Sequence, residues 1–301
     1  LEVATVAESV VVSAEAPLVD VSRSAVASNV TSSFLDRLPR GRSYMLAVSM
    51  APGTRSEGKA GGYQIDGSSG SENVWVIEGV DVTNLQTGTQ GSAYMPPEFV
   101  QEVQVKSSGF EAQYGGSTGG VVNVVVRSGG NAIHGDGSLS FNTDGMSASV
   151  RPYLRLNPTN DNVADYFFSP KDDYRTLYPG GSVSGPVKKD RLWFFASYYP
   201  SLYRAQRTVT FLVNKQTDTF FTRTKSDQFA GKLDFAPWQK LRTRVTYLYQ
   251  PSRTRGALPS REGTGSPQDP YSQRGGRSPV ATYSFAADYM ATPKLLLSLR
   301  G

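Results

Sequence analysis

The side chains that could act as acids, bases or metal ligands are few and scattered along this chain. His134 is the only histidine and cysteine is absent, which excludes histidine-based triads, multi-histidine metal sites and thiolate sites within the chain. The carboxylate pairs Asp172–Asp173 and Glu98/Glu102 lack a neighbouring group that would place an acid and a base around a substrate. The sequence therefore predicts no enzyme, no bound metal and no cofactor.

Two glycine-rich runs resemble phosphate-binding loops in composition only. GGSTGG at 115–120 and GTGSPQ at 263–268 lack the lysine and the strand-to-helix setting that such loops need. The net charge of +5 is small for 301 residues, and no nucleic-acid-binding module is recognisable. Nucleic acid is therefore not an expected partner.

The first of these runs lies in the most informative segment, residues 98–135, which reads EFVQEVQVKSSGFEAQYGGSTGGVVNVVVRSGGNAIHG. Strand-like runs at 100–105 and 121–127 flank its glycines, which allow a tight turn or a close approach between backbones. Spacing alone leaves an ordinary glycine-rich hairpin of a soluble β domain equally open. Upstream, a helical candidate at 31–38, an apolar run at 44–50 and a strand at 73–82 indicate a small α+β unit.

From residue 135 onward apolar residues alternate with mixed or polar ones, as in a sheet with one apolar face. The pattern predicts strands at 135–143, 178–187, 191–203, 226–236, 240–250, 280–290 and 294–300.

The predicted connections alternate between short turns (188–190, 237–239, 291–293) and long segments (144–177, 204–225, 251–279). In a meander this places every long loop on one side, which is typical of an outer-membrane barrel. A soluble sandwich gives the same alternation but no reason for long loops to share a side. Aromatic residues near the strand ends fit an interfacial girdle. No run approaches ~18 apolar residues, whereas barrel strands need only ~9–11.

The ends of the chain indicate a piece of a longer protein. There is no initiator methionine and no secretory signal, and the sequence stops within a predicted strand at 295–301. About seven strands cannot close a barrel of the plugged kind, which uses ~22.

Residues 98–135 resemble the end of the plug domain of TonB-dependent outer-membrane transporters. The resemblance rests on Glu102, Val103, Val105, Ala112, Tyr114, Gly115, Ser117, Gly119, Gly120, Val122, Asn123, Val125, Arg127, Ser128 and Gly129.

Other segments extend this resemblance. Residues 38–42 with 52–54 resemble the LP-GR and PG elements of the plug, and 77–82 resembles its DG strand, with Glu78 in place of the commoner Asp. Residues 181–195, GSVSGPVKKDRLWFF, are similar to the Oar-like branch. Members of that branch carry a carboxypeptidase-regulatory-like β-sandwich before the plug, and residues 1–14 look like its exit.

The resemblance implies an α+β plug domain followed by the N-terminal part of an antiparallel transmembrane β-barrel, with about 22 strands in the complete protein and about seven here. The expected divisions are residues 1–17 (sandwich exit and linker), 18–130 (plug) and 131–301 (partial barrel).

The family implies import of a scarce or bulky solute across the outer membrane of a Gram-negative bacterium. Energy would arrive mechanically from the TonB protein on the periplasmic side, through an extended segment that adds a strand to its sheet. A segment resembling such a TonB box runs through Glu8, Ser9, Val10, Val11, Val12, Ser13 and Ala14. The last strand of the preceding sandwich is an equal interpretation of it.

The same resemblance implies substrate contacts at the plug apex, in residues 61–72 and 86–97. The candidate contacts are Tyr63, Gln64, Asp66, Tyr94 and Met95. The expected structural motif of the plug is Tyr114, Gly115, Gly119, Gly120, Asn123 and Arg127. A structural role is an open alternative for each apex residue.

The expected partners are TonB, an extracellular solute and outer-membrane lipid, including lipopolysaccharide. Basic residues make the 251–279 loop able to attract anionic ligands or lipopolysaccharide phosphates, although an ordinary solvated loop explains them as well. Oligosaccharide, peptide and metal chelate stay open as solutes, and the long aromatic-rich loops favour a bulky polar polymer. The alternatives are a surface adhesion or assembly barrel without active import, and a soluble carbohydrate-binding β protein.

Overall fold

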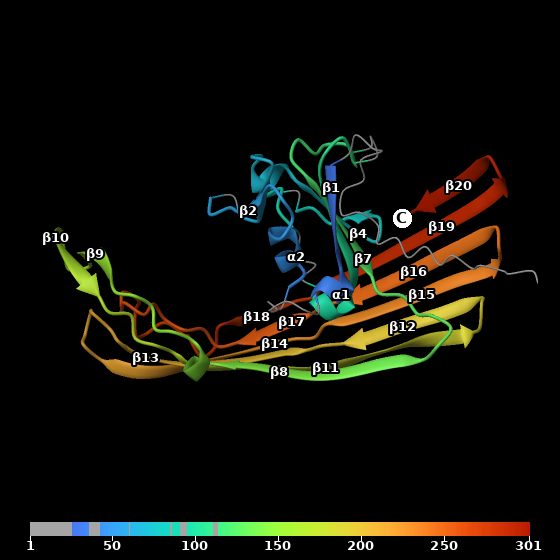
Figure 1. Cartoon of the computed structure of the whole chain (residues 1–301). Coiled ribbons are helices and arrows are strands. Elements are labelled where there is room, and N and C mark those ends of the chain that lie inside the picture. Colours follow the sequence, from blue (N-terminus) through green and yellow to red (C-terminus); the bar gives the residue numbers. More distant parts are fainter. Residues whose placement is uncertain (1–25, 36–42, 60, 85, 91–94, 111–113) are drawn as a thin grey trace, which may run out of the picture.

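The computed structural model describes residues 26–35, 43–59, 61–84, 86–90, 95–110 and 114–301 (Figure 1). A small N-terminal plug lies over the inner face of a larger, curved antiparallel sheet. The predicted TonB box at 8–14, the segment 38–42 and Tyr94 lie outside the described residues.

The plug is built on a mixed five-stranded sheet in the order β1-β6-β7-β4-β5, in which only the β4–β7 pair is parallel. Its strands are β1 (Val26–Thr31), β4 (Val74–Ile77), β5 (Val80–Asp81), β6 (Val100–Ser108) and β7 (Val121–Val126). Around it lie α1 (Ser32–Leu35), α2 (Met45–Ser49), β2 (Thr54–Ser56), β3 (Tyr63–Ile65), η1 (Gly70–Glu72) and η2 (Pro97–Phe99).

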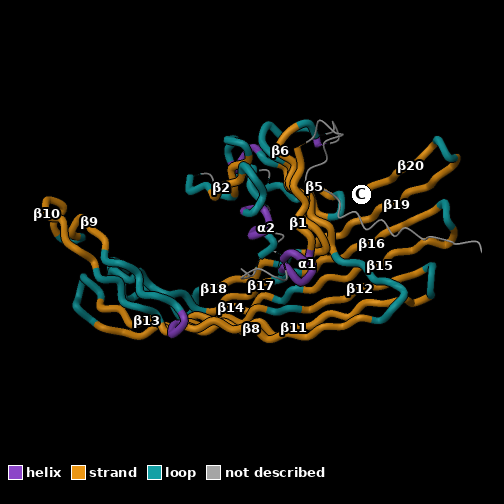
Figure 2. The backbone as a smooth tube through the Cα atoms, in the orientation of Figure 1, coloured by secondary structure: helices purple, strands orange, loops and turns teal. Residues whose placement is uncertain are grey.

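These elements follow the sequence pattern closely. The valine-rich runs predicted at 100–105 and 121–127 form the adjacent inner strands β6 and β7, and the run at 73–82 forms the β4–β5 hairpin. The apolar run at 44–50 becomes α2, and the described part of the 31–38 candidate becomes α1. Figure 2 shows how short these helices are. In the described part of the chain, no helix is long and apolar enough to cross a membrane.

The plug core is continuous with the inner face of the large sheet. Trp75, Phe99 and Val103 are fully buried within the plug, and Phe195 and Tyr199 of the large sheet belong to the same cluster. The rings of Phe99 and Tyr199 meet edge to face with centroids 6.2 Å apart. Each such large apolar side chain contributes roughly 1.5–3 kcal/mol on burial, so plug and sheet stabilise one another.

The large sheet contains eleven strands and continues without a break to the C-terminal end of the chain. They are β8 (His134–Thr143), β11 (Asp173–Lys188), β12 (Leu192–Tyr198), β13 (Ser201–Thr210), β14 (Thr217–Ser226), β15 (Phe229–Trp238), β16 (Leu241–Tyr249), β17 (Ser252–Arg255), β18 (Gly275–Ser278), β19 (Ala281–Thr292) and β20 (Leu295–Arg300). A separate hairpin, β9 (Tyr153–Asn157) and β10 (Asn160–Phe167), follows the one-turn η4 (Asp144–Met146).

These eleven strands trace seven passes of a simple meander. β11 pairs with β12 over one half of its length and with β13 over the other, so β12 and β13 form one pass interrupted at residues 199–200. The pairs β14–β15, β16–β17 and β18–β19 are interrupted at the same level. Proline occupies three of the four interruptions, at 200, 251 and 279, where it removes a donor from the ladder.

The structure corrects the prediction that residues 204–225 form a long loop. Strands β13 and β14 occupy most of that segment, and only residues 211–216 connect them. The sequence carries no strand signal here because β14 alternates threonine with arginine and lysine at 222–225, and neither strand carries a continuous apolar face. The segments predicted as the loops 144–177 and 251–279 also contain strands, namely β9, β10, the start of β11, β17 and β18.

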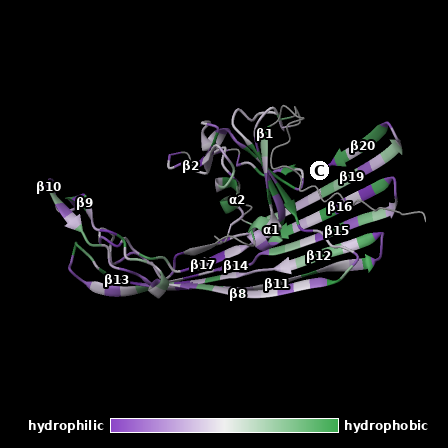
Figure 3. Ribbon diagram, viewed as in Figure 1, coloured by the Kyte–Doolittle hydropathy of each residue, from purple (hydrophilic) through white to green (hydrophobic). Residues whose placement is uncertain are grey.

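The two faces of the large sheet differ as a barrel wall requires. Alternate residues of β15, β16 and β19 present Leu233, Val245 and Phe285 outward, where they are exposed. Their neighbours Lys232, Thr246 and Ser284 point inward and are buried beneath the plug. The alternation is visible as stripes along the strands in Figure 3. The outward apolar face is the side that would meet lipid.

Candidate functional site

The glycines of the predicted plug motif allow the start of β7 to pack against the segment 65–73. A Cβ on Gly119 would lie 2.6 Å from Asn73 Oδ1, and a Cβ on Gly120 would lie 2.6 Å from Ile65 Cδ1. Both distances are far inside van der Waals contact, so no other residue fits without moving its neighbours. Gly119 and Gly120 therefore serve close packing within the plug.

Asn73 joins the segment 65–73 to the start of β7, and the sequence did not predict this role. Its side chain is buried, donates to the carbonyl of Tyr63 at 2.6 Å and accepts from the N–H of Gly120 at 2.8 Å. Buried amides that satisfy backbone groups in this way stabilise loops that have no ladder partners of their own. An asparagine at the end of a 3₁₀ turn carries no distinctive pattern, which explains why it went unnoticed.

The predicted apex residues do not form one surface. Tyr63 and Gln64 lie half-buried in β3, and Asp66 is exposed in the following turn with a φ of +48°. The β2–β3 hairpin projects from the plug toward the end of the sheet that carries the long connections (Figure 1). Met95 differs, because its side chain is fully buried in the plug core and its carbonyl accepts from the N–H of Tyr44 at 3.2 Å. We therefore assign Met95 to the core instead of to solute contact.

The remaining motif residues line the border between plug and wall. Tyr114 is half-buried with the Lys106 ammonium 4.6 Å from its ring centroid, and Gly115 is exposed. Asn123 lies half-buried in β7 and lines a cavity of about 510 Å³. Arg127 donates through Nε to the carbonyl of Val100 at 3.2 Å, which fixes the exit of the plug.

The cavity beside Asn123 lies between the two parts of the molecule. Glu78 and Val125 line it from the plug, while Arg244 and Arg300 line it from the wall. Asp288 accepts from both arginines, at 3.2 and 2.6 Å. These contacts hold the two guanidinium groups on the wall side of the cavity.

An ion pair buried between plug and wall is the most specific contact of the interface. Lys232 of β15 donates to a carboxylate oxygen of Glu78 at 2.9 Å and to the carbonyl of Val126 at 2.9 Å. The same carboxylate oxygen accepts from the N–H of Val126. The two side chains are only 1% and 5% exposed. Glu78 occupies a left-handed turn with φ +52°, which aims its side chain from the β4–β5 hairpin toward the wall.

The connections at the far end of the sheet are tied together by Asp172. Its carboxylate accepts two hydrogen bonds from Arg207 of β13, at 2.7 and 2.6 Å, and one from Arg261 at 2.7 Å. Burial alone would raise the pKa of Asp172, but the hydrogen bonds and charges of the two arginines outweigh it and hold that pKa below its ordinary value. The long connections before β11 and after β17 are thus fastened to the wall between them.

A second cluster joins the β9–β10 hairpin to the same loop. The Tyr153 hydroxyl donates to Glu262 at 2.7 Å, and Arg155 pairs with Glu262 at 3.1 Å and with Asp165 at 3.3 Å. The hydrogen bond to Glu262 raises the pKa of Tyr153. Phe211, Phe220 and Tyr271 pack nearby with ring centroids 5.0–6.4 Å apart. The outer connections therefore form an ordered, aromatic-rich cap.

Among the described residues, no three histidine, aspartate or glutamate side chains are grouped to hold a metal ion.

Comparison with known proteins agrees with this arrangement. Residues 20–121 match the family described as the TonB-dependent Receptor Plug Domain. The chain is 32% identical over 210 residues to the TonB-dependent transporter Oar of Myxococcus xanthus, a match that covers 64% of this chain and 18% of that protein. The chain thus spans less than a fifth of the length of this curated relative.

Solved structures show the same fold. FpvA of P. aeruginosa bound to heterologous pyoverdines is 13% identical with a TM-score of 0.55, over 92% of this chain and 33% of that one. The FpvAI–pyocin S2 complex gives 13% identity and a TM-score of 0.54, over 92% and 32%.

A plug seated on the inner face of an antiparallel wall, with the plug family's sequence, identifies the chain as part of a TonB-dependent receptor. Its sequence is of the Oar-like type over the 210 residues that it shares with the transporter Oar. Its location is the outer membrane of a Gram-negative bacterium.

Proposed function

We propose that the whole protein imports a scarce or bulky solute across the outer membrane by energy-coupled movement of the plug. The buried Glu78–Lys232 pair is the observation that carries this proposal. A plug that only filled the lumen permanently would be held best by apolar contacts, because burying an ion pair costs desolvation that the pair only partly repays. A polar contact can be exchanged for water when the plug is pulled.

The partner that pulls is, in this proposal, TonB on the periplasmic side. Residues 8–14 are the proposed handle, which would add a strand to a sheet of TonB. The outer cap built on Asp172 and Glu262 would meet the solute first, and its aromatic and polar side chains suit an oligosaccharide, a peptide or a metal chelate. The protein performs no chemistry on that solute.

A cysteine scan tests the energy coupling. Each residue from Glu8 to Ala14 is changed to cysteine in the full-length protein, freed of other cysteines, and crosslinked to a cysteine-bearing TonB C-terminal domain. We expect disulfides along this stretch that strengthen when cells receive an oligosaccharide mixture, a peptide digest or a ferric chelate. Val213→Cys, exposed on the turn between β13 and β14 at the opposite end of the wall, is the matched control and should form none.

The alternative is a barrel of the same fold that serves surface adhesion or assembly without import. Absence of crosslinks at all seven positions and at every upstream segment would favour that alternative. Crosslinks confined to an upstream segment would keep the transporter and move the handle.

A further inference from the structure

Four arginines stand directly opposite one another on neighbouring strands of the wall. Arg175 of β11 pairs with Arg204 of β13, Arg204 with Arg223 of β14, and Arg223 with Arg255 of β17. Like charges in directly opposed positions destabilise a sheet. A row of four such positions therefore requires an explanation outside the sheet itself.

A second basic row lies next to the first on the same face. Lys225 pairs with Arg253, and Arg253 pairs with Arg277. Lys225 and Arg253 lie two residues along their strands from Arg223 and Arg255 of the first row, and Arg277 lies directly opposite Arg253. Residues two apart on a strand point to the same face, so both rows share one side of the sheet. We call these seven residues the basic belt: Arg175, Arg204, Arg223, Lys225, Arg253, Arg255 and Arg277.

The basic belt points outward, away from the plug. β11 runs without interruption from Asp173 to Lys188, so Arg175 shares a face with Val183, which is exposed. Val183 lies in a cross-strand row that continues through Ala196 and Gly231 to the outward Tyr247 and Tyr283. The belt is therefore on the side of the wall that meets lipid.

The level of the belt along the strands matches the polar surface of a membrane. Tyr249 ends the outward apolar pattern of β16, and Arg253 and Arg255 follow it by four and six residues. At ~3.3 Å per residue, Arg253 and Arg255 lie ~13–20 Å beyond Tyr249 along the strand. With a strand tilt of ~40°, that distance corresponds to ~10–15 Å along the membrane normal. The short turns lie at the other end, so the belt borders the outer leaflet.

The charges of the belt are largely uncompensated. Lys225 pairs with Asp227 at 2.9 Å, whereas none of the six arginines has an ion pair with a carboxylate among the residues that the structure describes. An anion bound between neighbouring guanidinium groups would relieve their mutual repulsion.

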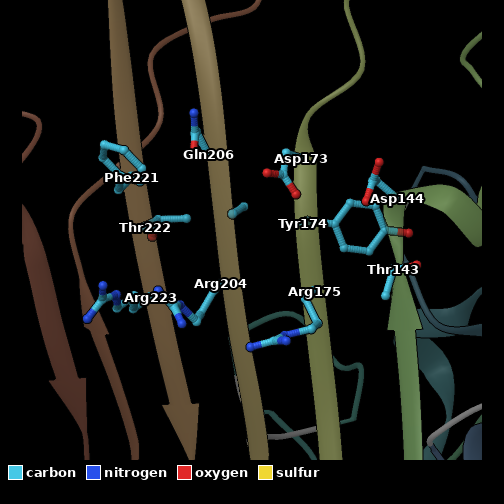
Figure 4. Close-up of a pocket in the computed structure, with 11 residues that line it drawn as sticks. Thr143, Asp144, Asp173, Tyr174, Arg175, Arg204, Gln206, Phe221, Thr222 and Arg223 are labelled. Carbon is cyan, nitrogen blue, oxygen red and sulfur yellow. The ribbon is translucent and has the colours of Figure 1, made fainter.

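A hollow on this face offers such a position. It has a volume of about 480 Å³ and is lined by Arg175, Arg204 and Arg223. Figure 4 shows these three side chains at one level, with Asp173 and Gln206 further toward the outer end. Asp173 and Asp144, which also lines the hollow, would repel an anion from that end and confine it to the level of the arginines.

We propose that the basic belt binds the phosphate groups of lipopolysaccharide, the phosphorylated glycolipid of the outer leaflet. Guanidinium groups bind phosphate oxygens through paired, charge-assisted hydrogen bonds, and clusters of this size are typical of phosphorylated headgroup recognition. The acyl chains would lie along the apolar face below, beside Leu177 and Leu202, which occupy the second row on β11 and β13. This site is independent of the proposed import, because the belt faces away from the lumen.

Binding to purified lipopolysaccharide tests the proposal. The full-length protein in detergent is titrated with native lipopolysaccharide and with the same material after enzymatic dephosphorylation. We expect native material to bind at least ~tenfold more tightly, and the double variant R204Q/R223Q to lose at least ~tenfold in affinity, since each lost charged hydrogen bond is worth about a factor of ten or more. R191Q/R242Q, two exposed arginines at the short-turn end, is the matched control and should bind normally.

Three results would overturn the proposal. Equal binding of dephosphorylated material would exclude phosphate recognition. Unchanged affinity of R204Q/R223Q, in a protein whose heat-modifiable migration shows an intact barrel, would exclude the belt. Competition by millimolar inorganic phosphate alone would assign the site to free phosphate instead of lipid.

Discussion

Lys232 in the barrel wall and Glu78 in the plug, 154 residues apart in sequence, form a buried ion pair at 2.9 Å. The pair also satisfies both the N–H and the carbonyl of Val126 at the end of the last plug strand. One polar contact therefore fixes the β4–β5 turn, the exit of β7 and the wall together.

Removing one member of this pair should loosen the plug. Lys232→Met leaves the Glu78 carboxylate buried without its counter-charge, and we expect a loss of ~3–5 kcal/mol in the stability of the docked plug. Glu78→Gln combined with Lys232→Met should recover part of that loss. Calorimetry of the full-length protein in detergent measures both. Additive losses in the double variant would show that the two residues do not interact.

Gly120→Ala should destabilise the plug by ~1–3 kcal/mol, because the new Cβ would overlap Ile65 in a packed core. Gly58→Ala is the matched control, since a Cβ there meets nothing within 4 Å. Chemical denaturation of the plug gives both values. Equal stability of the two variants would contradict the close packing described for this motif.

Asn73→Ala should cost ~1–3 kcal/mol, because it leaves the carbonyl of Tyr63 and the N–H of Gly120 buried without partners. Asn29→Ala, at an exposed position that accepts from Gln104, should change stability by less than ~0.5 kcal/mol. Hydrogen exchange at the Gly120 amide provides a local readout. Unchanged protection of that amide in Asn73→Ala would refute the role assigned to Asn73.

The outer cap should open in acid. Because the pKa of Asp172 is lower in the docked loops than its ordinary value of 3.8, its contribution to docking is complete well above pH 3.8 and disappears as the pH falls through and below that value. Spin labels at Thr159→Cys and Thr264→Cys should give a narrow distance distribution at pH 7 and a broad one at pH 3.

Two variants isolate Asp172 in this experiment. Asp172→Asn should give the broad distribution at both pH values. Asp269→Asn removes an exposed pair with Arg274 and should behave like the unaltered protein. A narrow distribution for Asp172→Asn at pH 7 would show that other contacts hold the cap.

The sequence predicted the wall well where strands cross lipid and poorly where they extend beyond it. Alternation in 229–235 and 241–249 requires apolar residues on the outward face, so period two is visible there. In β13 and β14 polar and charged residues interrupt the apolar ones on both faces, so the two strands resemble a loop in sequence. The Glu78–Lys232 pair and the register of the arginine row depend on contacts between distant segments, for which no local pattern exists.

The glycine motif, in contrast to the ion pair and the arginine row, was recognisable in the sequence. Gly119 and Gly120 were expected from the resemblance to the plug domain, and their neighbours Asn73 and Ile65 supply the physical reason for glycine there. The predicted apex residues differ in burial: Met95 is buried, whereas Tyr63, Gln64 and Asp66 are at least partly exposed. Nothing in the sequence indicates this difference, because a methionine in a loop can be either buried or exposed.

Labelling of a cysteine hidden between plug and wall tests energy-coupled plug movement most directly. Ala230 is fully buried in the core that plug and wall share. Cells that carry Ala230→Cys in an otherwise cysteine-free full-length protein are treated with a membrane-impermeant thiol reagent. Val213→Cys, at an exposed position, is the labelling control. An oligosaccharide mixture, a peptide digest and a ferric chelate are supplied in turn. We predict that at least one of these supplies increases labelling of the Ala230→Cys variant, and only in cells that have TonB and a proton-motive force. Labelling that is the same with and without TonB under every supply would contradict the account.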